Sequence, residues 1–391
     1  MRRDLRGGAL GKIETFIVAL PKRRPHNWAS KMTTPIGSHL VVRIEDDDGR
    51  VGWGEAPAIA TWGGAHMRYY GETPETAQHL VERHLWPAVE GCSPLEPTVL
   101  HARMDAVVKG HPYAKAALDI ACFDLAGKML EVPVATLLGG HVRDRITVCH
   151  SLGIMDEDDA LDEAETAVGE GIRTIKVKTG LDAERDVRLV RRLRERLAEG
   201  VQIRVDANEG YPTISEAVRT TQRMIDEAAI FLCEQPVAGA RALAAVARRI
   251  SIPVMADESA WTLQDIVELA SLEAAEAFSL YVTKPGGLFR ARQQAEAAAA
   301  LGFMCDIGGS IEMGIGNAAN LHLGAATPIA SLPSVCPVSA PEHASRGIAG
   351  NYYTDDIVRD PFVLKDGSVL VPEGPGLGVE VAEDKLRTYA L

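Results

Sequence analysis

Three acidic residues that close or follow short apolar runs are the features of this sequence best suited to chemistry. They are Asp206, Glu234 and Asp257. Carboxylates brought together repel one another and take up protons unless a cation neutralises them. Mg²⁺ prefers oxygen ligands and keeps positions open for water and substrate, whereas the lack of His and Cys at these positions disfavours zinc. The pattern predicts a Mg²⁺ site, with Mn²⁺ as the alternative ion. For any one acid alone, a helix cap or a lysine partner is the ordinary alternative.

Three lysines occupy comparable positions. Lys176 and Lys178 are two residues apart on one expected strand, so their side chains point to the same side. Neighbouring ammonium groups lower each other's pKa, and one of them can then act as a base near neutral pH. Lys284 ends an expected strand about halfway round a closed ring from Lys178, so this pair can address both faces of one carbon atom. An ion pair with a carboxylate is the alternative, and for Lys176 it competes with a contact to a substrate oxyanion.

The runs that carry these residues alternate with amphipathic segments rich in Ala, Arg and Glu. The runs cover residues 147–152, 174–178, 202–206, 230–234, 254–257, 277–284 and 302–307, with a weak eighth run at 334–338. Alternating strands and helices indicate a parallel sheet. Seven or eight such units predict an α/β fold, a TIM-like (β/α)7β barrel, in which active sites lie at the carboxyl ends of the strands. No GxGxxG motif follows an early strand, which weakens the dinucleotide-binding alternative.

The N-terminal part has a different pattern. Strand-like alternation covers residues 12–20, 38–45 and 50–55, and helices are expected from Thr73 and over residues 114–130. We therefore expect an α+β domain over residues 1–135, a barrel over 136–350 and a C-terminal segment over 351–391.

Composition excludes several classes of function. The chain has 391 residues and a formal net charge of −13, which argues against nucleic acid and against an anionic membrane surface as partners. It contains no run of 18 apolar residues and no signal peptide, so a cytoplasmic location is expected. Its six cysteines are scattered and without a CxxC motif, which predicts reduced, buried thiols.

The motifs, taken in order, resemble the enolase superfamily in its muconate-lactonizing-enzyme subgroup. They are KVK at 176–178, DAN at 206–208, EQP at 234–236, DES at 257–259 and KPGG at 284–287, with VGWGE at 51–55, YAKAALD at 113–119, PVATLLGG at 133–140 and GPGLG at 374–378. Their order and spacing are more specific than any single motif, and the resemblance covers most of the chain.

The resemblance implies a role for each matching residue. Asp206, Glu234 and Asp257 match the Mg²⁺ ligands, and Lys178 and Lys284 match the acid/base pair. Lys176 matches the lysine beside the substrate carboxylate. Two further residues match positions that hold the ligands or Lys284, namely Asn208 and Glu258. The N-terminal block, completed by the C-terminal tail, would be a capping domain whose loops, residues 24–34 and 60–70, close over the substrate.

Other residues are weaker candidates. His26 and Trp28 in the first loop are expected to contact the substrate. Ser310 belongs to a GGS segment whose backbone amides can face a carboxylate, and Glu312 is a neighbouring candidate contact. Asp306 is expected to support the site by pairing with Lys284. Pro337 stands where muconate cycloisomerases have a glutamate on the eighth strand, which separates this chain from that pattern.

The shared chemistry implied is formation or protonation of an enolate next to a carboxylate on a small substrate, in a homo-oligomer between a dimer and an octamer. The first loop, RRPHNW at 23–28, favours a muconate-type cycloisomerase. A racemase or epimerase of an amino-acid derivative, dipeptide or proline betaine stays open, as does a hydroxy-acid dehydratase. A Schiff-base lysine lyase and a non-catalytic barrel are the alternatives outside enolate chemistry.

Overall fold

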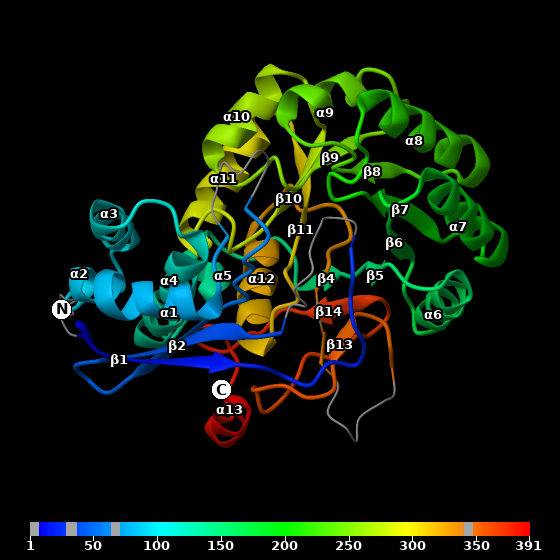
Figure 1. Cartoon of the computed structure of the whole chain (residues 1–391). Helices are drawn as coiled ribbons and strands as arrows, with labels where there is room; N and C mark the ends of the chain where they lie inside the picture. The colour runs from blue at the N-terminus through cyan, green and yellow to red at the C-terminus, as the bar shows by residue number, and fades with distance from the viewer. Residues whose placement is uncertain (1–7, 29–36, 64–70, 337, 340–346) are drawn as a thin grey trace.

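The computed structural model describes residues 8–28, 37–63, 71–336, 338–339 and 347–391. Figure 1 shows a ring of strands and helices with an α+β layer packed against one side of it. The fold is the expected α/β architecture, a TIM-like barrel with an N-terminal capping layer. The expected domain boundaries at residues 135 and 350 stay predictions.

The capping layer is a three-stranded antiparallel sheet covered by helices. Its strands, in the order β1-β2-β3, are Leu10–Val18, His39–Asp46 and Val51–Ala56. Its helices are α1 (Pro74–Leu80), the π-helical η2 (Val81–Leu85), α2 (Trp86–Val89), α3 (Pro97–Val107) and α4 (Pro112–Leu130). The main chain of α4 lies directly on β3. A Cβ atom at Gly54 would come within 1.9 Å of the Ala117 carbonyl oxygen, which explains the glycine in the VGWGE motif.

The barrel contains a seven-stranded parallel sheet in the order β11-β10-β9-β8-β7-β6-β5. Its strands are β5 (His150–Leu152), β6 (Thr174–Lys178), β7 (Gln202–Asp206), β8 (Leu232–Glu234), β9 (Val254–Ala256), β10 (Ala277–Leu280) and β11 (Met304–Ile307). The outer helices are α6 (Glu157–Gly169), α7 (Ala183–Arg196), α8 (Ile214–Ala228), α9 (Ala240–Ala247), α10 (Leu263–Ser271), α11 (Leu288–Ala300) and α12 (Gly314–Ala326). The weak eighth run closes the ring, because Ser334 bridges to Val148 and the Val335 amide donates to the Ile307 carbonyl at 3.2 Å.

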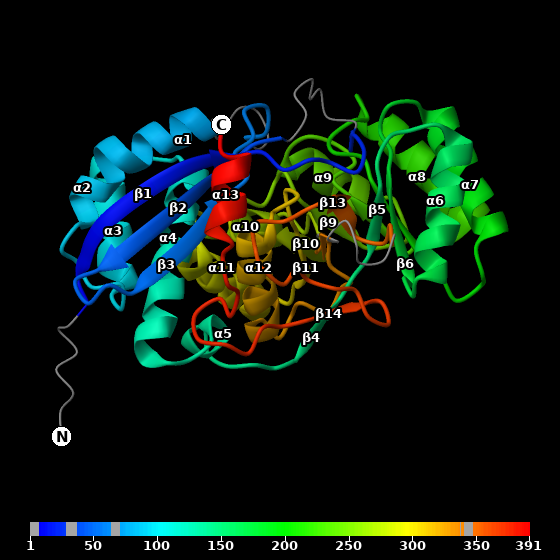
Figure 2. The same ribbon diagram turned by 90° about the horizontal axis from the view of Figure 1, so that it is seen from below.

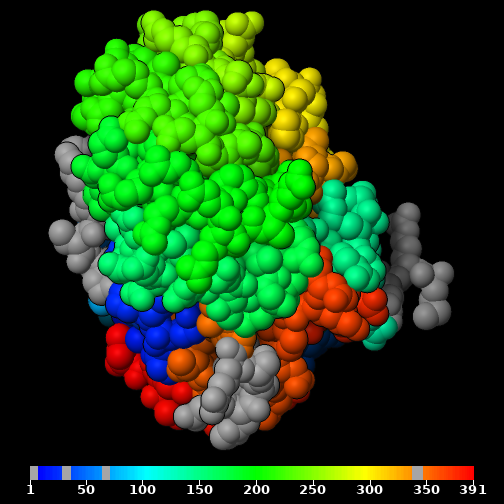
Figure 3. Space-filling model, turned by 90° about the vertical axis from the view of Figure 1, so that its right-hand side faces the viewer, coloured from blue at the N-terminus to red at the C-terminus, as the bar shows by residue number. Residues whose placement is uncertain are grey.

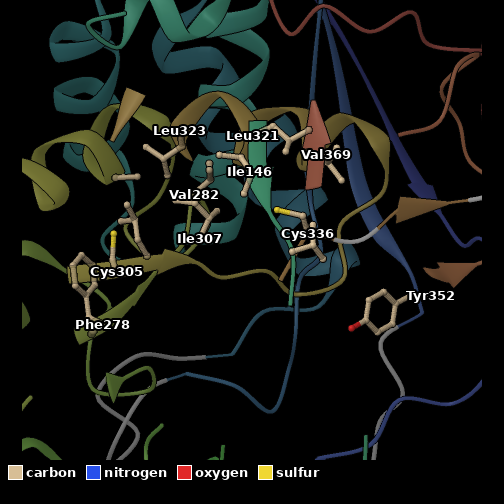
Figure 4. Close-up of a cluster of buried hydrophobic side chains, with 14 of the residues drawn as sticks. Ile146, Phe278, Val282, Cys305, Ile307, Leu321, Leu323, Cys336, Tyr352 and Val369 are labelled. Carbon is tan, nitrogen blue, oxygen red and sulfur yellow. The ribbon is translucent and has the colours of Figure 1, made fainter. Parts of the chain in front are cut away.

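Two expected strands are wrong in extent. The run at 147–152 is divided: β4 (Arg145–Thr147) pairs antiparallel with β14 (Ser368–Leu370), and only β5 joins the barrel. The run at 277–284 is a strand only as far as Leu280, so Lys284 lies in the turn beyond it. Side chains from β4, β14, β10, β11 and α12 belong to one apolar cluster, shown in Figure 4.

The C-terminal segment crosses the molecule. It contains β13 (Asn351–Tyr353), which pairs with β12 (Val338–Ser339) just before the segment, then β14 and α13 (Glu383–Tyr389). Its end returns to the first strand, where the Ala19 amide donates to the Tyr389 carbonyl at 3.0 Å and the Leu391 amide to the Ile17 carbonyl at 2.9 Å. Figure 2 shows α13, in red, beside the sheet of the capping layer.

Other expectations can be compared with the described residues. All six cysteines are buried and unpaired, as predicted. The basic stretch of α7 is a surface helix whose arginines pair with acids on α6 and α8, on the face drawn in green in Figure 3. Within the described ranges, no helix is both long and apolar enough to cross a membrane.

Candidate active site

Strand register brings the predicted residues of the first strands into one row. Lys178 is paired with Asp206 across β6 and β7, and Asp206 is paired with Glu234 across β7 and β8. Asp257 directly follows β9. The three carboxylates are 0%, 0% and 2% exposed. The carboxyl ends of neighbouring parallel strands thus gather charged groups that are almost completely buried.

Two lysines neutralise part of this row. Lys176 Nζ lies 2.8 Å from Asp206 Oδ2 and 2.7 Å from Glu234 Oε1, and Lys178 Nζ lies 2.6 Å from Asp206 Oδ2. Burial alone would raise the pKa of Asp206, but both ammonium groups hold it well below its ordinary value. Burial, together with the charge of Asp206, raises the pKa of Glu234 to about 7. Lys176 differs from the sequence expectation: despite the lowering effect of burial, the two carboxylates raise its pKa well above its ordinary value.

Lys284 approaches from the turn after β10. Its Nζ donates to the Asp257 main-chain oxygen at 2.8 Å, contacts Asp257 Oδ1 and lies 4.0 Å from the centre of the Tyr281 ring. The Trp62 ring is 5.3 Å from the same nitrogen. The predicted pairing of Lys284 with Asp306 is wrong.

Asp306 is instead held inside the barrel by two other strands. Its Oδ2 is 2.7 Å from Nη2 of the fully buried Arg204 on β7, and its Oδ1 accepts from Ser279 Oγ on β10 at 2.9 Å. A guanidinium with no access to water requires a carboxylate partner, and Asp306 on the opposite wall provides it. This pair lies below the site and supports the barrel itself.

A chain of hydrogen bonds joins Lys178 to the capping layer. Asn208 Oδ1 accepts from Lys178 Nζ at 2.8 Å, while Asn208 Nδ2 donates to Glu258 Oε1 at 2.8 Å. The same Glu258 oxygen accepts from Trp62 Nε1 at 3.3 Å. Burial and the charge of Asp257 raise the pKa of Glu258 well above its ordinary value. Asn208 and Glu258 therefore connect Lys178 to Trp62 of the capping layer, and the expectation that they hold the metal ligands or Lys284 stays a prediction.

A pocket lies over these groups. His26 and Trp28 enter it from the first loop, and the Trp28 ring is 5.7 Å from Lys178 Nζ. Desolvation and the charge of Lys178 lower the pKa of His26 well below its ordinary value, so that the imidazole is neutral at physiological pH. The remaining described lining residues are Ile59, Trp62, Ser151, Lys176, Lys178, Asn208, Asp257, Tyr281, Gly309, Ser310, Ile311, Val335 and Tyr352.

The GGS segment is arranged differently from the prediction. The Ser310 amide donates to both carboxylate oxygens of Glu312 at 3.0 Å, so a carboxylate of the chain itself takes the place expected for a substrate carboxylate. Burial raises the pKa of Glu312 to about 7. Ser310 lines the pocket, whereas Glu312, the other predicted substrate contact of this segment, is not among the described lining residues. Pro337 and residues 29–34 and 64–70 of the two predicted closing loops are outside the described residues.

The carboxylate oxygens of Asp206, Glu234 and Asp257 are ligands of the kind that a hard cation prefers. In this structure the lysine ammonium groups bind these oxygens instead. Among the described residues, no three His, Cys, Asp or Glu side chains are grouped so as to hold a metal ion. Glu234 Oε2 nevertheless is buried without a hydrogen-bond partner, in a row of oxygen donors. Buried polar atoms are almost always satisfied, and an orphaned carboxylate oxygen among carboxylates is suited to a divalent ion such as Mg²⁺.

Sequence reasoning missed three aromatic or polar contributors. Tyr281 covers Lys284, Tyr352 lies edge-on to His26 with ring centres 5.2 Å apart, and Ser151 lines the floor of the pocket at β5. Tyr281 and Ser151 were open to detection, because each lies in or next to a predicted barrel strand at its carboxyl end. Tyr352 gives no such signal, since the segment that carries it is distant in sequence.

Comparison with known proteins agrees with this arrangement. The model of the mandelate racemase/muconate lactonizing enzyme N-terminal domain matches residues 12–139, and that of the enolase C-terminal domain-like family matches residues 159–385. Muconate cycloisomerase 1 of Rhodococcus opacus is 33% identical over 386 residues, which cover 96% of this chain and 97% of that protein. The N-succinyl-L-Arg/Lys racemase of Bacillus cereus is 31% identical over 379 residues, 96% of each chain.

Solved structures are equally similar. Muconate lactonizing enzyme from Pseudomonas fluorescens, complexed with muconolactone, superimposes with a TM-score of 0.89 at 28% identity, over 98% of this chain and 100% of that one. The N-succinyl Arg/Lys racemase from Bacillus cereus superimposes with a TM-score of 0.87 at 28% identity, over 98% of both chains. The chain therefore belongs to the enolase superfamily, in its muconate-lactonizing-enzyme subgroup, and is an isomerase.

Proposed function

We propose that this protein racemises or epimerises a small carboxylate by moving a proton at the carbon next to the carboxylate group, with Lys178 and Lys284 as the acid/base pair. The observation that carries the proposal is the placement of the two lysines. Lys178 ends β6 and Lys284 follows β10, with three strands of the barrel between them. Ammonium groups that approach from two sides of a ring can serve opposite faces of one carbon atom.

The carbon acid next to a carboxylate is weak because its conjugate base carries two negative charges on oxygen. Asp206, Glu234 and Asp257 would hold Mg²⁺, which when bound stabilises that developing charge. Lys176 is the residue beside the substrate carboxylate, where its ammonium group would stabilise the charge that develops on oxygen.

The side chains around the two lysines orient them and limit water. Asn208 Oδ1 accepts one hydrogen of Lys178 Nζ, and the Asp257 main-chain oxygen accepts one of Lys284 Nζ. Trp28 lies over the first lysine, and Tyr281 and Trp62 lie over the second. One lysine would take the α-proton from its face of the carbon, and the other would return a proton to the opposite face.

The described wall of the pocket supports an amino-acid derivative as substrate. His26, Trp28, Tyr281 and Tyr352 present aromatic surface, and His26 is neutral. Such a wall suits the acyl group or side chain of an N-acylated amino acid. The relative named N-succinyl-L-Arg/Lys racemase makes this class the first to test.

Cycloisomerisation is the second candidate, because the chain is 33% identical over 386 residues to a muconate cycloisomerase. That reaction closes a lactone on a dicarboxylate and needs one lysine to protonate the resulting enolate. The two candidates therefore differ in whether the second lysine transfers a proton.

One experiment separates them. The protein with Mg²⁺ is incubated in D₂O with pooled N-acylamino acids, dipeptides, proline derivatives and muconates, and ¹H NMR follows each substrate. We expect loss of the α-proton signal without net chemical change, and no exchange after treatment with a chelator. New lactone signals would establish cycloisomerisation instead, and no change in any carboxylate with Mg²⁺ present would overturn the proposal.

A further inference from the structure

We propose that Asp119 on α4, braced by His101, is a positioning residue for Lys284. The inference rests on the proposed function of Lys284 and extends it: a residue of the capping layer sets the placement of one acid/base lysine and not of the other. The geometry of the turn after β10 points to this role.

Two main-chain hydrogen bonds close the turn that carries Lys284, one of them from the Gly286 amide to the Thr283 carbonyl at 3.1 Å. β10 ends at Leu280, and the Gly287 amide donates back to the Val282 carbonyl at 2.9 Å. Helix α11 then begins at Leu288 after Gly287, which has no side chain to cap it. The Leu288 amide donates instead to Asp119 Oδ2 at 2.5 Å. Negative charge at a helix start stabilises the helix, so Asp119 acts as the missing cap from another part of the chain.

Contact between the turn and this carboxylate is close. Gly287 has a φ of +127°, and a Cβ atom there would lie 2.3 Å from Asp119 Cγ. The KPGG motif thus requires glycine at this position for two reasons: the backbone conformation and the approach of Asp119. The carboxylate therefore lies directly against the turn, three residues after Lys284.

Asp119 is itself held from the other side. It is 3% exposed, and its Oδ1 lies 2.7 Å from His101 Nε2 on α3. The His101 ring is 5.3 Å from that of Phe289, the second residue of α11. Each carboxylate oxygen therefore serves one donor, Leu288 or His101. An asparagine at this position loses the negative charge and one of the two acceptor oxygens that serve Leu288 and His101.

Among the described residues, the capping layer reaches Lys178 only through side chains, from Trp62 by way of Glu258 and Asn208, and does not hold its main chain. Lys178 lies on β6 in register with β7, so the ladder of the barrel places its main chain. The proposal therefore predicts an effect on one lysine only. Displacement of a catalytic group by about 1 Å can cost roughly 10²-fold in rate.

Asp119→Asn tests the proposal, with Asp124→Asn as the matched control. Asp124 lies on the same helix, is 1% exposed and accepts from the Trp53 and Leu377 amides, at 2.9 and 2.8 Å, away from the turn. Deuterium exchange at the α-carbon is measured for each enantiomer of an N-succinylamino acid separately. Lys284→Met identifies the enantiomer whose proton Lys284 removes. We expect Asp119→Asn to slow exchange of that enantiomer by about tenfold or more and the other by less than about twofold.

A second measurement tests the role of Asp119 without relying on enzyme activity. Amide hydrogen exchange of the peptide spanning residues 282–290 should be about tenfold faster in Asp119→Asn and unchanged in Asp124→Asn. His101→Leu should give a smaller effect of the same kind, and His101→Gln, which keeps a donor, should restore the turn. Unchanged protection of this peptide, or equal slowing of both enantiomers, would overturn the proposal. If the wild-type protein exchanges no α-proton, the proposed function fails, and the amide measurement still decides whether Asp119 holds the turn.

Discussion

The regions around Lys178 and Lys284 place the same functional group in different ways. Lys178 is the last residue of a regular strand, and its ammonium group is bound to Asp206 and Asn208 of the next strand and the loop after it. Lys284 lies four residues beyond its strand and is 1% exposed. Its ammonium group is bound to Asp257, and its turn is fixed by Asp119 of the capping layer.

The difference shows which part of the site the barrel can build alone. Parallel strands in register place the Lys178 side, as barrels do for catalytic residues in general. The Lys284 side needs the capping layer, which contributes Asp119 below the turn and Trp62 above the ammonium group. Changes in the capping layer should therefore affect the two faces of a substrate unequally.

The largest expected effect comes from removing either lysine. Lys178→Met and Lys284→Met should each lower the rate of racemisation of an N-succinylamino acid by roughly 10²–10⁴-fold, the usual contribution of a general acid or base. Polarimetry with Mg²⁺ present measures the rate. Full activity in either variant would show that the two lysines are not a pair.

Substitution of either tryptophan near the two lysines should reduce activity by an intermediate amount, through kcat for one residue and through KM for the other. Trp62 is 7% exposed and packs at a tilt against Trp261 and Tyr281, with ring centres 5.1 and 5.3 Å away. Trp62→Leu should therefore admit water to Lys284 and lower kcat by about tenfold. Trp28 is only partly buried, and Trp28→Leu should mainly raise KM. Steady-state kinetics measure kcat and KM of each variant. If both variants changed kcat and KM to the same extent, the two tryptophans would not have the different roles proposed here.

Glu163→Gln should loosen the first loop on the Lys178 side. Glu163 on α6 accepts from Arg24 Nε at 2.8 Å and lies 2.8 Å from His150 Nε2, and it thereby ties residues 23–28 to the barrel. We expect KM to rise several-fold at neutral pH, with little change in kcat. A fall in kcat with constant KM would contradict a role in holding the loop.

The same residue predicts a pH dependence. Burial alone would raise the pKa of Glu163, but bonds from His150 and Arg24 hold it well below its ordinary value. A carboxyl whose pKa is lowered by folding stabilises the protein fully above its unfolded pKa of about 4.3, and this contribution is lost as the pH falls below it. Melting temperature measured from pH 6 to 3 should therefore fall more steeply for the wild type than for Glu163→Gln. If the melting temperatures of the two proteins fell in parallel with pH, Glu163 would not be the source of the pH dependence.

The smallest effect is expected from Glu157→Gln, a control on the same helix. Glu157 pairs with Arg188 and Arg192 on the surface, where such pairs contribute about 0–1 kcal/mol. Thermal unfolding should shift by a few degrees at most, with unchanged KM. A kinetic effect as large as that of Glu163→Gln would show that α6 as a whole, rather than Glu163, controls the loop.

The sequence predicted the parts of the fold that depend on local pattern. The bounds of β6 and β7 coincide with apolar runs that end in Lys178 and Asp206, because an apolar run bounded by charge specifies both strand and end. The resemblance to the enolase superfamily is confirmed by both domain models.

Features that depend on distant contacts were not predictable in this way. Residues 281–283 (YVT) continue the pattern of a strand, but the turn that leads to Asp119 ends β10 before them. Asp306 can be recognised in the sequence as an acid at the end of an expected strand. Its partner Arg204 cannot, because the sequence pattern only predicts that Arg204 lies within a buried strand. The pairing of β4 with β14 joins segments more than 200 residues apart in sequence.

Exchange of the α-proton, measured separately for the two enantiomers of an N-succinylamino acid in D₂O with Mg²⁺, tests the central claim most directly. If Lys178 and Lys284 serve opposite faces, Lys178→Met should retain exchange of one enantiomer and Lys284→Met exchange of the other, and neither variant should racemise its substrate. Loss of exchange for both enantiomers in one variant, with no effect in the other, would contradict the claim that the two lysines form a pair.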